Sequence, residues 1–286
     1  MENIFFKNDS PEELGDSKNI IQEDDDTSLS IKQKYIPCPM RYGTSRYYTH
    51  RNILSLKRLI FPPIAEDKLS QIMIDDESIK YISFASSAQE ITNIIMNNLE
   101  DFPSPASLAC ALATRSEQKW NCKLLNKKMK HLVITEMTAG VGGNVLNFAK
   151  YFKYVNAIEL DLVRYNYLNK NIKLYGHDNV NCYNADSLHL LVEKDDLVQD
   201  IIFFDPPWGG KDYKLFTHLK LKFGDYSIEN ICKVLFQRVR NKMIVLKLPN
   251  NYDFDFLQDE LKEYRVSKFV LDRMTMIVVK NYKSVD

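Results

Sequence analysis

The sequence lacks the features that would place a chain in a membrane or a secretory pathway. No apolar run approaches the ~18–20 residues of a membrane-spanning helix, and the N-terminus lacks the basic-then-apolar pattern of a signal peptide. Hydrophobic residues make up 45% and charged residues 27% of the 286 positions, which excludes a collagen-like, coiled-coil or wholly disordered chain. We therefore expect a globular protein that works inside a cell.

Cysteine and histidine are too few and too scattered to indicate a metal site or a disulfide framework. The five cysteines are odd in number and include no Cys-x-x-Cys pair, and the five histidines show no ligand spacing. We expect free thiols in a reducing compartment and no bound metal. The cysteines are Cys38, Cys110, Cys122, Cys182 and Cys232.

Acidic residues are absent between positions 32 and 60, although the whole chain carries 38 basic and 38 acidic residues. Residues 1–31, in contrast, are acidic and include a run of four acids at 23–26. We expect 1–31 to be a disordered tail, which could also bind a protein partner. This segregation is typical either of a protein that contacts phosphate groups or of a solvated tail beside a basic surface.

Residues 32–130 are expected to form an N-terminal extension that is partly helical and helps to close an active site. Up to position 60 the stretch contains prolines and no clear period, which predicts irregular structure. Ser86 and Ser87 are good N-cap candidates for a helix that follows, and an alanine-rich helix is expected near 107–114. The apolar residues at helical spacing behind the serines are Ile91, Ile94, Ile95 and Leu99.

From residue 131 to 286 strands and helices alternate, which predicts a mostly parallel sheet with helices on both faces. Only Asp272 and Arg273 separate the last two strands, so that pair must be antiparallel. The prediction is an α/β fold, the class I (Rossmann-like) methyltransferase, with seven strands and a C-terminal antiparallel hairpin strand. Strands are expected at 132–137, 155–159, 180–183, 200–204, 243–248, 266–271 and 274–280, and helices at 144–152, 162–174, 228–240 and 254–263.

A glycine-rich motif, Glu-Met-Thr-Ala-Gly-Val-Gly-Gly-Asn at 136–144, stands between the first strand and its helix. Glycines there allow a sharp turn and a close approach to a ligand at the helix N-terminus. The spacing differs from the dinucleotide pattern Gly-x-Gly-x-x-Gly. Glu136 is suited to accept hydrogen bonds from the cationic amino-acid end of S-adenosylmethionine, and Thr138, Gly140 and Gly142 are predicted to contact the same cofactor.

Two further acidic positions follow the second and third strands. A carboxylate at the end of the second strand can bind both hydroxyls of an adenosine ribose, and Glu159 is favoured over Asp161 for that role. Asp186 could accept from the exocyclic amine of adenine, or it could cap the following helix. Neither signal is specific alone, but both stand where a cofactor site requires them.

The strongest motif is Asp-Pro-Pro-Trp-Gly-Gly at 205–210, after the apolar strand at 200–204. Prolines fix the backbone φ and hold the loop rigid at the carboxyl end of a central strand. An acid followed by two prolines and an aromatic residue is typical of methyltransferases acting on exocyclic amines. Asp205, helped by the carbonyl of Pro206, would accept the amine hydrogens and is also predicted to contact the cofactor, and Trp208 would offer a flat face for the base.

Taken together, the motifs at 140–144, 157–161, 205–213 and 248–250 resemble the trimethylguanosine synthases, in the correct order. The resemblance covers about residues 130–282, with a fainter match at 83–95. It implies transfer of methyl groups from S-adenosylmethionine to the exocyclic N2 of a 7-methylguanosine RNA cap. Pro-Pro-Trp-Gly-Gly is the most specific element of the match.

Carried over by position, the resemblance implies that Trp208 stacks on the 7-methylguanine and that Tyr213 lies near the cap phosphates. Two residues depart from the family pattern. Asp205 stands where the family usually has Ser, and Asn250 stands where it usually has Arg, which removes a candidate phosphate contact. Lys211, where the family often has Pro, is predicted to replace part of that charge, and Asn250 stays a candidate substrate residue.

Three functions remain open at this point. The leading hypothesis is cap hypermethylation of capped RNA. An enzyme acting on adenine-N6 or guanine-N2 within RNA or DNA would share the chemistry but usually needs a strongly basic groove, against which the neutral net charge argues. A non-catalytic RNA- or protein-binding module would not need the whole series of acids and glycines. A cellular cap enzyme would be nuclear, whereas a viral one could work in the cytoplasm.

Overall fold

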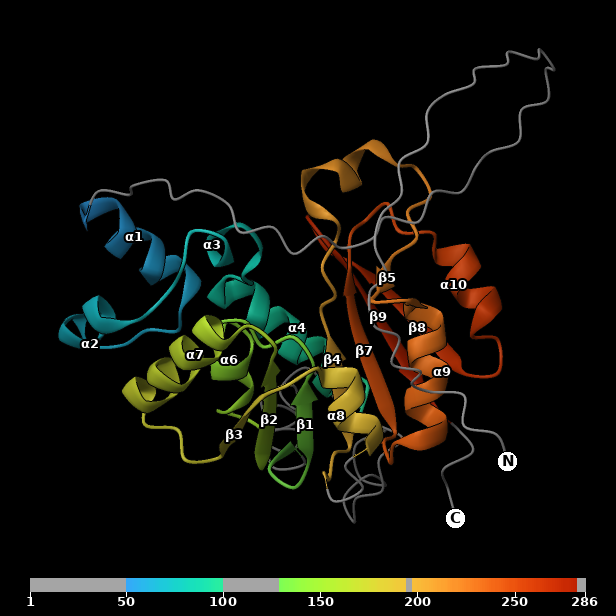
Figure 1. Cartoon of the computed structure of the whole chain (residues 1–286), viewed down its shortest axis with the longest axis horizontal. Coiled ribbons are helices and arrows are strands. Elements are labelled where there is room, and N and C mark those ends of the chain that lie inside the picture. The colour runs from blue at the N-terminus through green and yellow to red at the C-terminus, as the bar shows by residue number, and fades with distance from the viewer. Residues whose placement is uncertain (1–49, 100–128, 194–196, 282–286) are drawn as a thin grey trace, which may run out of the picture. The chain divides into compact units, whose positions relative to one another are not determined.

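A seven-stranded sheet covered by helices on both faces forms the core of the protein (Figure 1). This computed structural model describes residues 50–99, 129–193 and 197–281. The expectations for the acidic tail at 1–31 and for a helix near 107–114 lie outside the described residues.

The strand order is β3-β2-β1-β4-β7-β9-β8, and β9 runs antiparallel to both of its neighbours. The predicted class I methyltransferase fold is therefore confirmed, and every predicted strand end lies within one residue of the observed one. The strands are β1 (Val133–Glu136), β2 (Tyr154–Glu159), β3 (Val180–Asn184), β4 (Ile201–Phe204), β7 (Met243–Leu248), β8 (Arg265–Val270) and β9 (Thr275–Lys280).

Burial of the sheet on both faces explains the uninterrupted apolar sequence of its central strands. In β4, Ile201 and Phe203 join one hydrophobic cluster, whereas Ile202 and Phe204 join another on the opposite face. The first cluster includes residues of α1 (His50–Ile60), α4 (Ala85–Asn97), α6 and α7, and the second includes residues of α8, α9 and α10. These later helices are α6 (Val145–Phe148), α7 (Leu162–Tyr175), α8 (Ser187–Glu193), α9 (Ile228–Arg238) and α10 (Phe254–Glu260). A 3-10 helix, η2 (Gly210–Leu215), and a small hairpin of β5 (Lys222–Phe223) and β6 (Tyr226–Ser227) lie between β4 and α9.

The prediction of irregular structure up to position 60 was wrong for its last part, because α1 (His50–Ile60) is a helix. Leu54, Leu56 and Ile60 of this helix pack on the hydrophobic cluster, but position 57, which is also buried, is a lysine and interrupts the apolar period. Lys57 is buried and its ammonium donates to the Ser70 carbonyl at 3.1 Å. The helix is followed by α2 (Glu66–Gln71) and α3 (Ser78–Tyr81).

The helix predicted after Ser86 and Ser87 is α4 (Ala85–Asn97), but neither serine caps it. Its N-cap is Phe84, and both serines lie inside the first turn. Tertiary contacts fix its position instead, since the buried Asn147 of α6 donates to the Ala88 carbonyl at 3.0 Å. None of the described helices is long and apolar enough to cross a membrane.

Candidate active site

Four parallel strands, β1, β2, β4 and β7, end at the same edge of the sheet, and most of the polar residues singled out in the sequence lie there. Ligands of open α/β sheets bind outside this carboxyl edge. Glu136 ends β1, Glu159 ends β2, Asp205 follows β4 and Lys247 stands next to the end of β7.

The glycine-rich loop bends sharply as it leaves β1. Gly140 and Gly142 have φ values of +54° and +104°, which side chains other than glycine rarely adopt. A Cβ atom on Gly140 would meet no described atom within 4 Å, whereas one on Gly142 would lie 3.0 Å from Leu168 Cδ1. The loop is therefore open on the side of Gly140 and packed against α7 on the side of Gly142.

Glu136 is buried at the end of β1, with 1% of its surface exposed. One carboxylate oxygen accepts from the Asn144 amide at 3.2 Å, and the other, Oε2, is buried without a hydrogen-bond partner among the described residues. Burial raises the pKa of Glu136 well above its ordinary value. A buried carboxylate oxygen that lacks a donor is suited to a cationic ligand group such as an ammonium.

Glu159 links β2 to the glycine-rich loop. Its Oε2 accepts from the Gly140 backbone N–H at 2.7 Å and its Oε1 accepts from the Asp161 backbone N–H at 2.9 Å. Burial raises the pKa of Glu159, although the two hydrogen bonds act to lower it. Asp161 is instead the N-cap of α7, where it accepts from the Arg164 N–H at 2.9 Å. Of the two acids weighed for ribose binding, Glu159 is the one beside the loop.

Asp186 is exposed and caps α8, since its carboxylate accepts from the His189 backbone N–H at 3.0 Å. The capping function weighed in the sequence is therefore present in the structure. Contact between Asp186 and an adenine ring stays a prediction.

Asp205 forms an ion pair with Lys247 that the sequence motifs do not predict. The Lys247 ammonium lies 2.5 Å from Oδ2 of Asp205, and only 5% and 18% of the two side chains are exposed. Burial raises the pKa of Asp205, and the nearby Lys247 opposes that shift. The Asp205 carbonyl also accepts from the Thr138 hydroxyl at 2.9 Å, which ties this loop to the glycine-rich loop.

A signal for Lys247 was present in the sequence, because it is the one charged residue in the strand Met-Ile-Val-Leu-Lys-Leu. A lysine in a strand buried on both faces requires a partner. Spacing along the chain does not identify Asp205 as the partner of Lys247. The two residues are 42 positions apart and meet because β4 and β7 pair in parallel in the sheet.

Trp208 packs between Lys247 and Tyr213. The indole N–H donates to the Lys247 carbonyl at 3.3 Å, and its ring meets that of Tyr213 edge to face at 5.3 Å between centroids. Positive φ values at Gly209 and Gly210 turn the chain from the Trp208 loop into η2, which carries Tyr213. The structure thus brings Asp205, Trp208 and Tyr213 together around Lys247, and Pro206 in the same loop is buried.

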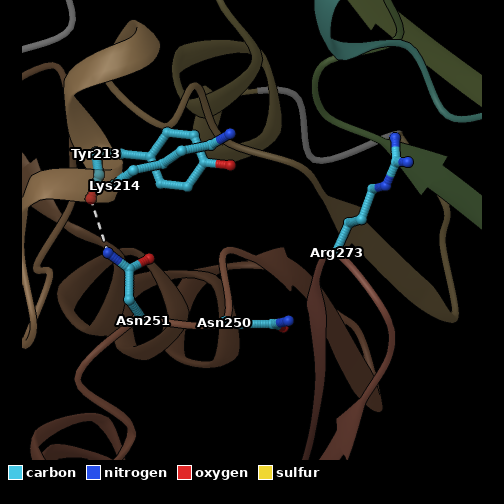
Figure 2. Close-up of a pocket in the computed structure, with 5 residues that line it drawn as sticks. All are labelled: Tyr213, Lys214, Asn250, Asn251 and Arg273. Carbon is cyan, nitrogen blue, oxygen red and sulfur yellow. Dashed lines mark hydrogen bonds between the residues drawn. The ribbon is translucent and has the colours of Figure 1, made fainter.

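A pocket of about 450 Å³ lies beside Tyr213 (Figure 2). Asn251 holds its wall in place by donating to the Tyr213 carbonyl at 2.7 Å. The Lys211 backbone is part of η2, but its side chain lies outside the described residues. The residues that line the pocket are Tyr213, Lys214, Asn250, Asn251 and Arg273.

Asn250, predicted as a substrate residue, is engaged with the turn between β8 and β9. Its amide donates to the carbonyls of Leu271 and Asp272, both at 3.2 Å, and accepts from the Thr275 hydroxyl at 2.9 Å. A substrate contact of Asn250 stays a prediction, whereas its structural contact is to this turn.

Residues 131–284 match the sequence profile of the RNA cap guanine-N2 methyltransferases. The chain belongs to this family. Two proteins are similar to this chain in sequence. Over 231 residues the chain is 65% identical to "Uncharacterized protein L320" of Acanthamoeba polyphaga mimivirus, covering 81% of this chain and 88% of that protein. Over 133 residues it is 30% identical to the trimethylguanosine synthase of Saccharomyces cerevisiae, covering 43% of this chain and 40% of that one.

The resemblance predicted from the motifs is thus confirmed at the level of the RNA cap guanine-N2 methyltransferase family. Among solved structures, a Thermus thermophilus 16S rRNA N2 G1207 methyltransferase with AdoMet and guanosine overlaps 60% of this chain and 44% of its own, with a TM-score of 0.44 and 14% identity. An Escherichia coli putative methyltransferase, yhhF, gives a TM-score of 0.41 at 14% identity, covering 59% of this chain and 88% of its own. Similarities this distant carry nothing about the substrate of this family member.

Proposed function

We propose that the protein transfers methyl groups from S-adenosylmethionine to the exocyclic N2 of 7-methylguanosine in an RNA cap. The observation that carries this proposal is the grouping of Asp205, Trp208 and Tyr213 at the end of β4, in a chain of the cap guanine-N2 family. An acid beside a half-buried aromatic side chain is suited to a flat base that bears an amine.

The glycine-rich loop and the acids beside it fit the proposed cofactor. S-adenosylmethionine, when bound, supplies an electrophilic methyl group. Glu136 Oε2 offers a buried acceptor for the ammonium of the amino-acid end, and the space beside Gly140 admits a ligand close to the backbone. Glu159, held by the loop N–H of Gly140, presents a carboxylate for the ribose hydroxyls.

Asp205 would act on the amine. The lone pair of an exocyclic amine is delocalised into its ring, so the amine is a weak nucleophile. One Asp205 oxygen is held by Lys247, and the other can accept an amine hydrogen and orient the lone pair toward the methyl group. Lys247 favours the ionised carboxylate that this contact requires, and the proton would leave after transfer.

Trp208 would select the charged base. Methylation at N7 gives guanine a positive charge, so stacking on an indole gains about 0.5–2 kcal/mol of cation–π energy, or roughly 2- to 30-fold over plain guanine. This preference needs no hydrogen bond to the methyl group. A cap also lies at the end of a strand, so no base must be extracted from a duplex.

The direct test is methyl transfer from radiolabelled S-adenosylmethionine to 7-methyl-GTP, GTP and an uncapped RNA, side by side. We expect transfer to 7-methyl-GTP only. Transfer only to the RNA would move the protein to the internal-base class, and cofactor binding without any transfer would favour the binding-module alternative.

Two variants separate the proposed contributions in the same assay. Trp208→Ala should lose most transfer to 7-methyl-GTP and keep its cofactor affinity, whereas Glu159→Ala should weaken the cofactor first. If cofactor affinity and activity fell equally in Trp208→Ala, the assignment of Trp208 to the base would be wrong.

A further inference from the structure

We infer that Asn251 is a positioning residue for the proposed base site, because its side chain fixes the place of Tyr213 beside Trp208. The inference rests on the proposed function, in which Trp208 stacks on the base. Asn251 stands one position after the motif at 248–250, and no motif assigns a role to it. It is 38 positions away from Tyr213 in the chain, so only the fold brings the two residues together.

The Asn251 side chain holds the end of η2 by two hydrogen bonds. Its amide nitrogen donates to the Tyr213 carbonyl at 2.7 Å (Figure 2) and to the Phe216 carbonyl at 2.6 Å. The Asn251 backbone carbonyl accepts from the Leu219 N–H at 2.9 Å, and the Leu219 carbonyl accepts from the Asp253 N–H at 2.9 Å. The segment from Tyr213 to Leu219 is thus held by four hydrogen bonds to one segment that follows β7.

This part of the chain depends on these bonds because few of its side chains are covered. Among residues 212–218 only Tyr213 and Phe216 are half-buried, and the other five are exposed. A 3-10 helix also has poorer hydrogen-bond geometry than an α-helix, so η2 by itself is weakly stable. The two half-buried residues are the ones whose carbonyls accept from Asn251, so its amide holds the segment where the segment meets the protein.

The backbone that carries Asn251 is itself fixed. Tyr252 is only 8% exposed, and its hydroxyl donates at 2.6 Å to Glu229 of α9, which is buried as well. The next residue, Asp253, caps α10 by accepting from the Phe256 N–H at 3.1 Å. Two helices therefore hold the backbone beside Asn251, so its amide is in place before a substrate binds.

Both aromatic rings of the proposed base site are positioned from the end of β7. The indole N–H of Trp208 donates to the Lys247 carbonyl. Tyr213, which meets the Trp208 ring edge to face at 5.3 Å, is held by Asn251. The proposed cofactor acids end β1 and β2, which lie on the other side of β4 in the sheet. Loss of the Asn251 bonds should therefore weaken binding of the base and leave binding of the cofactor unchanged.

The chain contains a second copy of this arrangement far from the proposed site. Asn179, at the amino end of β3, donates to the carbonyls of Ala149 and Phe152 at 2.9 and 3.0 Å. Its backbone carbonyl accepts from the Val155 N–H at 2.9 Å. The accepting carbonyls are again three residues apart, and both asparagines are half-buried. Asn179→Ala is therefore the matched control for Asn251→Ala, because it removes equivalent bonds at the opposite edge of the sheet.

The test is steady-state methyl transfer to 7-methyl-GTP, with S-adenosylmethionine affinity measured separately by calorimetry. Asn251→Ala should raise the KM for 7-methyl-GTP about 5- to 30-fold, change kcat less than about 3-fold and leave the cofactor affinity unchanged. Asn251→Asp keeps the shape of the side chain but removes both donated hydrogens, so it should raise the KM at least as much. Asn179→Ala should lower the urea midpoint of unfolding as far as Asn251→Ala does and leave the KM unchanged.

A double variant shows whether Asn251 acts through Tyr213. In a Tyr213→Ala background, where the KM should already be raised, adding Asn251→Ala should change it by less than about 2-fold. Fully additive effects of the two substitutions would contradict this route. Hydrogen exchange without substrate gives a second readout, because Asn251→Ala should lose protection at 213–219 and Asn179→Ala should not.

The outcomes separate this inference from the proposed function. An unchanged KM in Asn251→Ala, or a loss of cofactor affinity as large as the rise in KM, would overturn the positioning role even if 7-methyl-GTP is methylated. Transfer only to uncapped RNA would overturn the proposed cap substrate, and the same KM comparison made with that RNA would still test Asn251. Failure of the wild type to methylate either substrate would contradict both.

Discussion

Among contacts between individual residues, the Asp205–Lys247 ion pair bears most directly on the proposed chemistry, because it affects the pKa of Asp205. A carboxylate buried beside Glu136 would favour its protonated form, and the ammonium at 2.5 Å counteracts this. The charged groups that face Asp205 are Lys247 from β7 and Glu136 from β1. The ammonium of Lys247, near the end of the neighbouring strand β7, thus favours the ionised form of the acid that would accept the amine hydrogen.

The pH dependence of activity tests this pairing. Replacing Lys247 by Met removes the charge that lowers the pKa of Asp205, so that pKa should rise and the acidic limb of the kcat/KM profile should move to higher pH. Lys247→Arg keeps the positive charge and should keep the acidic limb near its original position. Profiles measured between about pH 5 and 9 compare the two variants.

An unchanged profile in Lys247→Met would mean that Lys247 does not act through Asp205. The double variant Asp205→Ser with Lys247→Met provides the control, since in an Asp205→Ser background the second substitution should no longer move the acidic limb.

At the scale of elements, residues 82 and 83, which precede α4, pack tightly against the glycine-rich loop. A Cβ atom on Gly143 would lie 2.6 Å from Ile82 Cγ1 and 3.2 Å from the Ser83 carbonyl oxygen. Only glycine permits this contact, which places the N-terminal extension directly on the proposed cofactor loop. The contact supports the proposal that residues 32–130 help to close the site.

Gly143→Ala should therefore displace this segment from the loop. We expect a loss of about 1–3 kcal/mol in the free energy of unfolding, together with weaker S-adenosylmethionine binding. Ile82→Ala removes Cγ1 and Cδ1, so adding it to Gly143→Ala should recover part of the cofactor affinity. Urea unfolding measures the free energy of unfolding of both variants, and calorimetry measures their S-adenosylmethionine affinity. If the double variant recovered no affinity, the contact with Ile82 would not be the cause of the loss.

For the whole molecule, the extension and the sheet share one hydrophobic cluster. It includes Ile60 of α1, Ile91 of α4 and Val245 of β7. The buried Asn171 of α7 adds polar links, because its amide exchanges two hydrogen bonds of 2.8 Å with the Met73 backbone and donates to the Val141 carbonyl at 2.9 Å. Residues 50–99 are thus part of the methyltransferase core in structural terms.

Asn171→Leu should destabilise the protein as a unit. It leaves three backbone groups without their partner, which should cost about 3 kcal/mol or more. Asn169→Ala on the same helix should cost less than about 1 kcal/mol, because among the described residues the Asn169 amide donates to the Tyr165 carbonyl one turn away and to no other group. Hydrogen exchange should show residues 50–99 and the sheet losing protection together. Selective loss of protection at 50–99 would contradict a shared core.

Most of the fold was predictable from the sequence, because strands buried on both faces appear as short apolar runs whatever their neighbours. The apolar strand at 243–248 was located to the residue. The first helix escaped detection because a buried lysine, Lys57, interrupts its apolar stripe, and the start of α4 was misplaced because packing on α6 outweighs a capping serine.

The sequence by itself determined the order of strands and helices, the family and the position of the motifs, since these depend on local periodicity and on residues close together in the chain. Only the tertiary structure decided which side chains meet. The pairing of Asp205 with Lys247 depends on the adjacency of β4 and β7, and the engagement of Asn250 with the Arg273 turn depends on the antiparallel pairing of β9 with β7. Contacts across a sheet are set by strand order, which spacing along the chain does not encode.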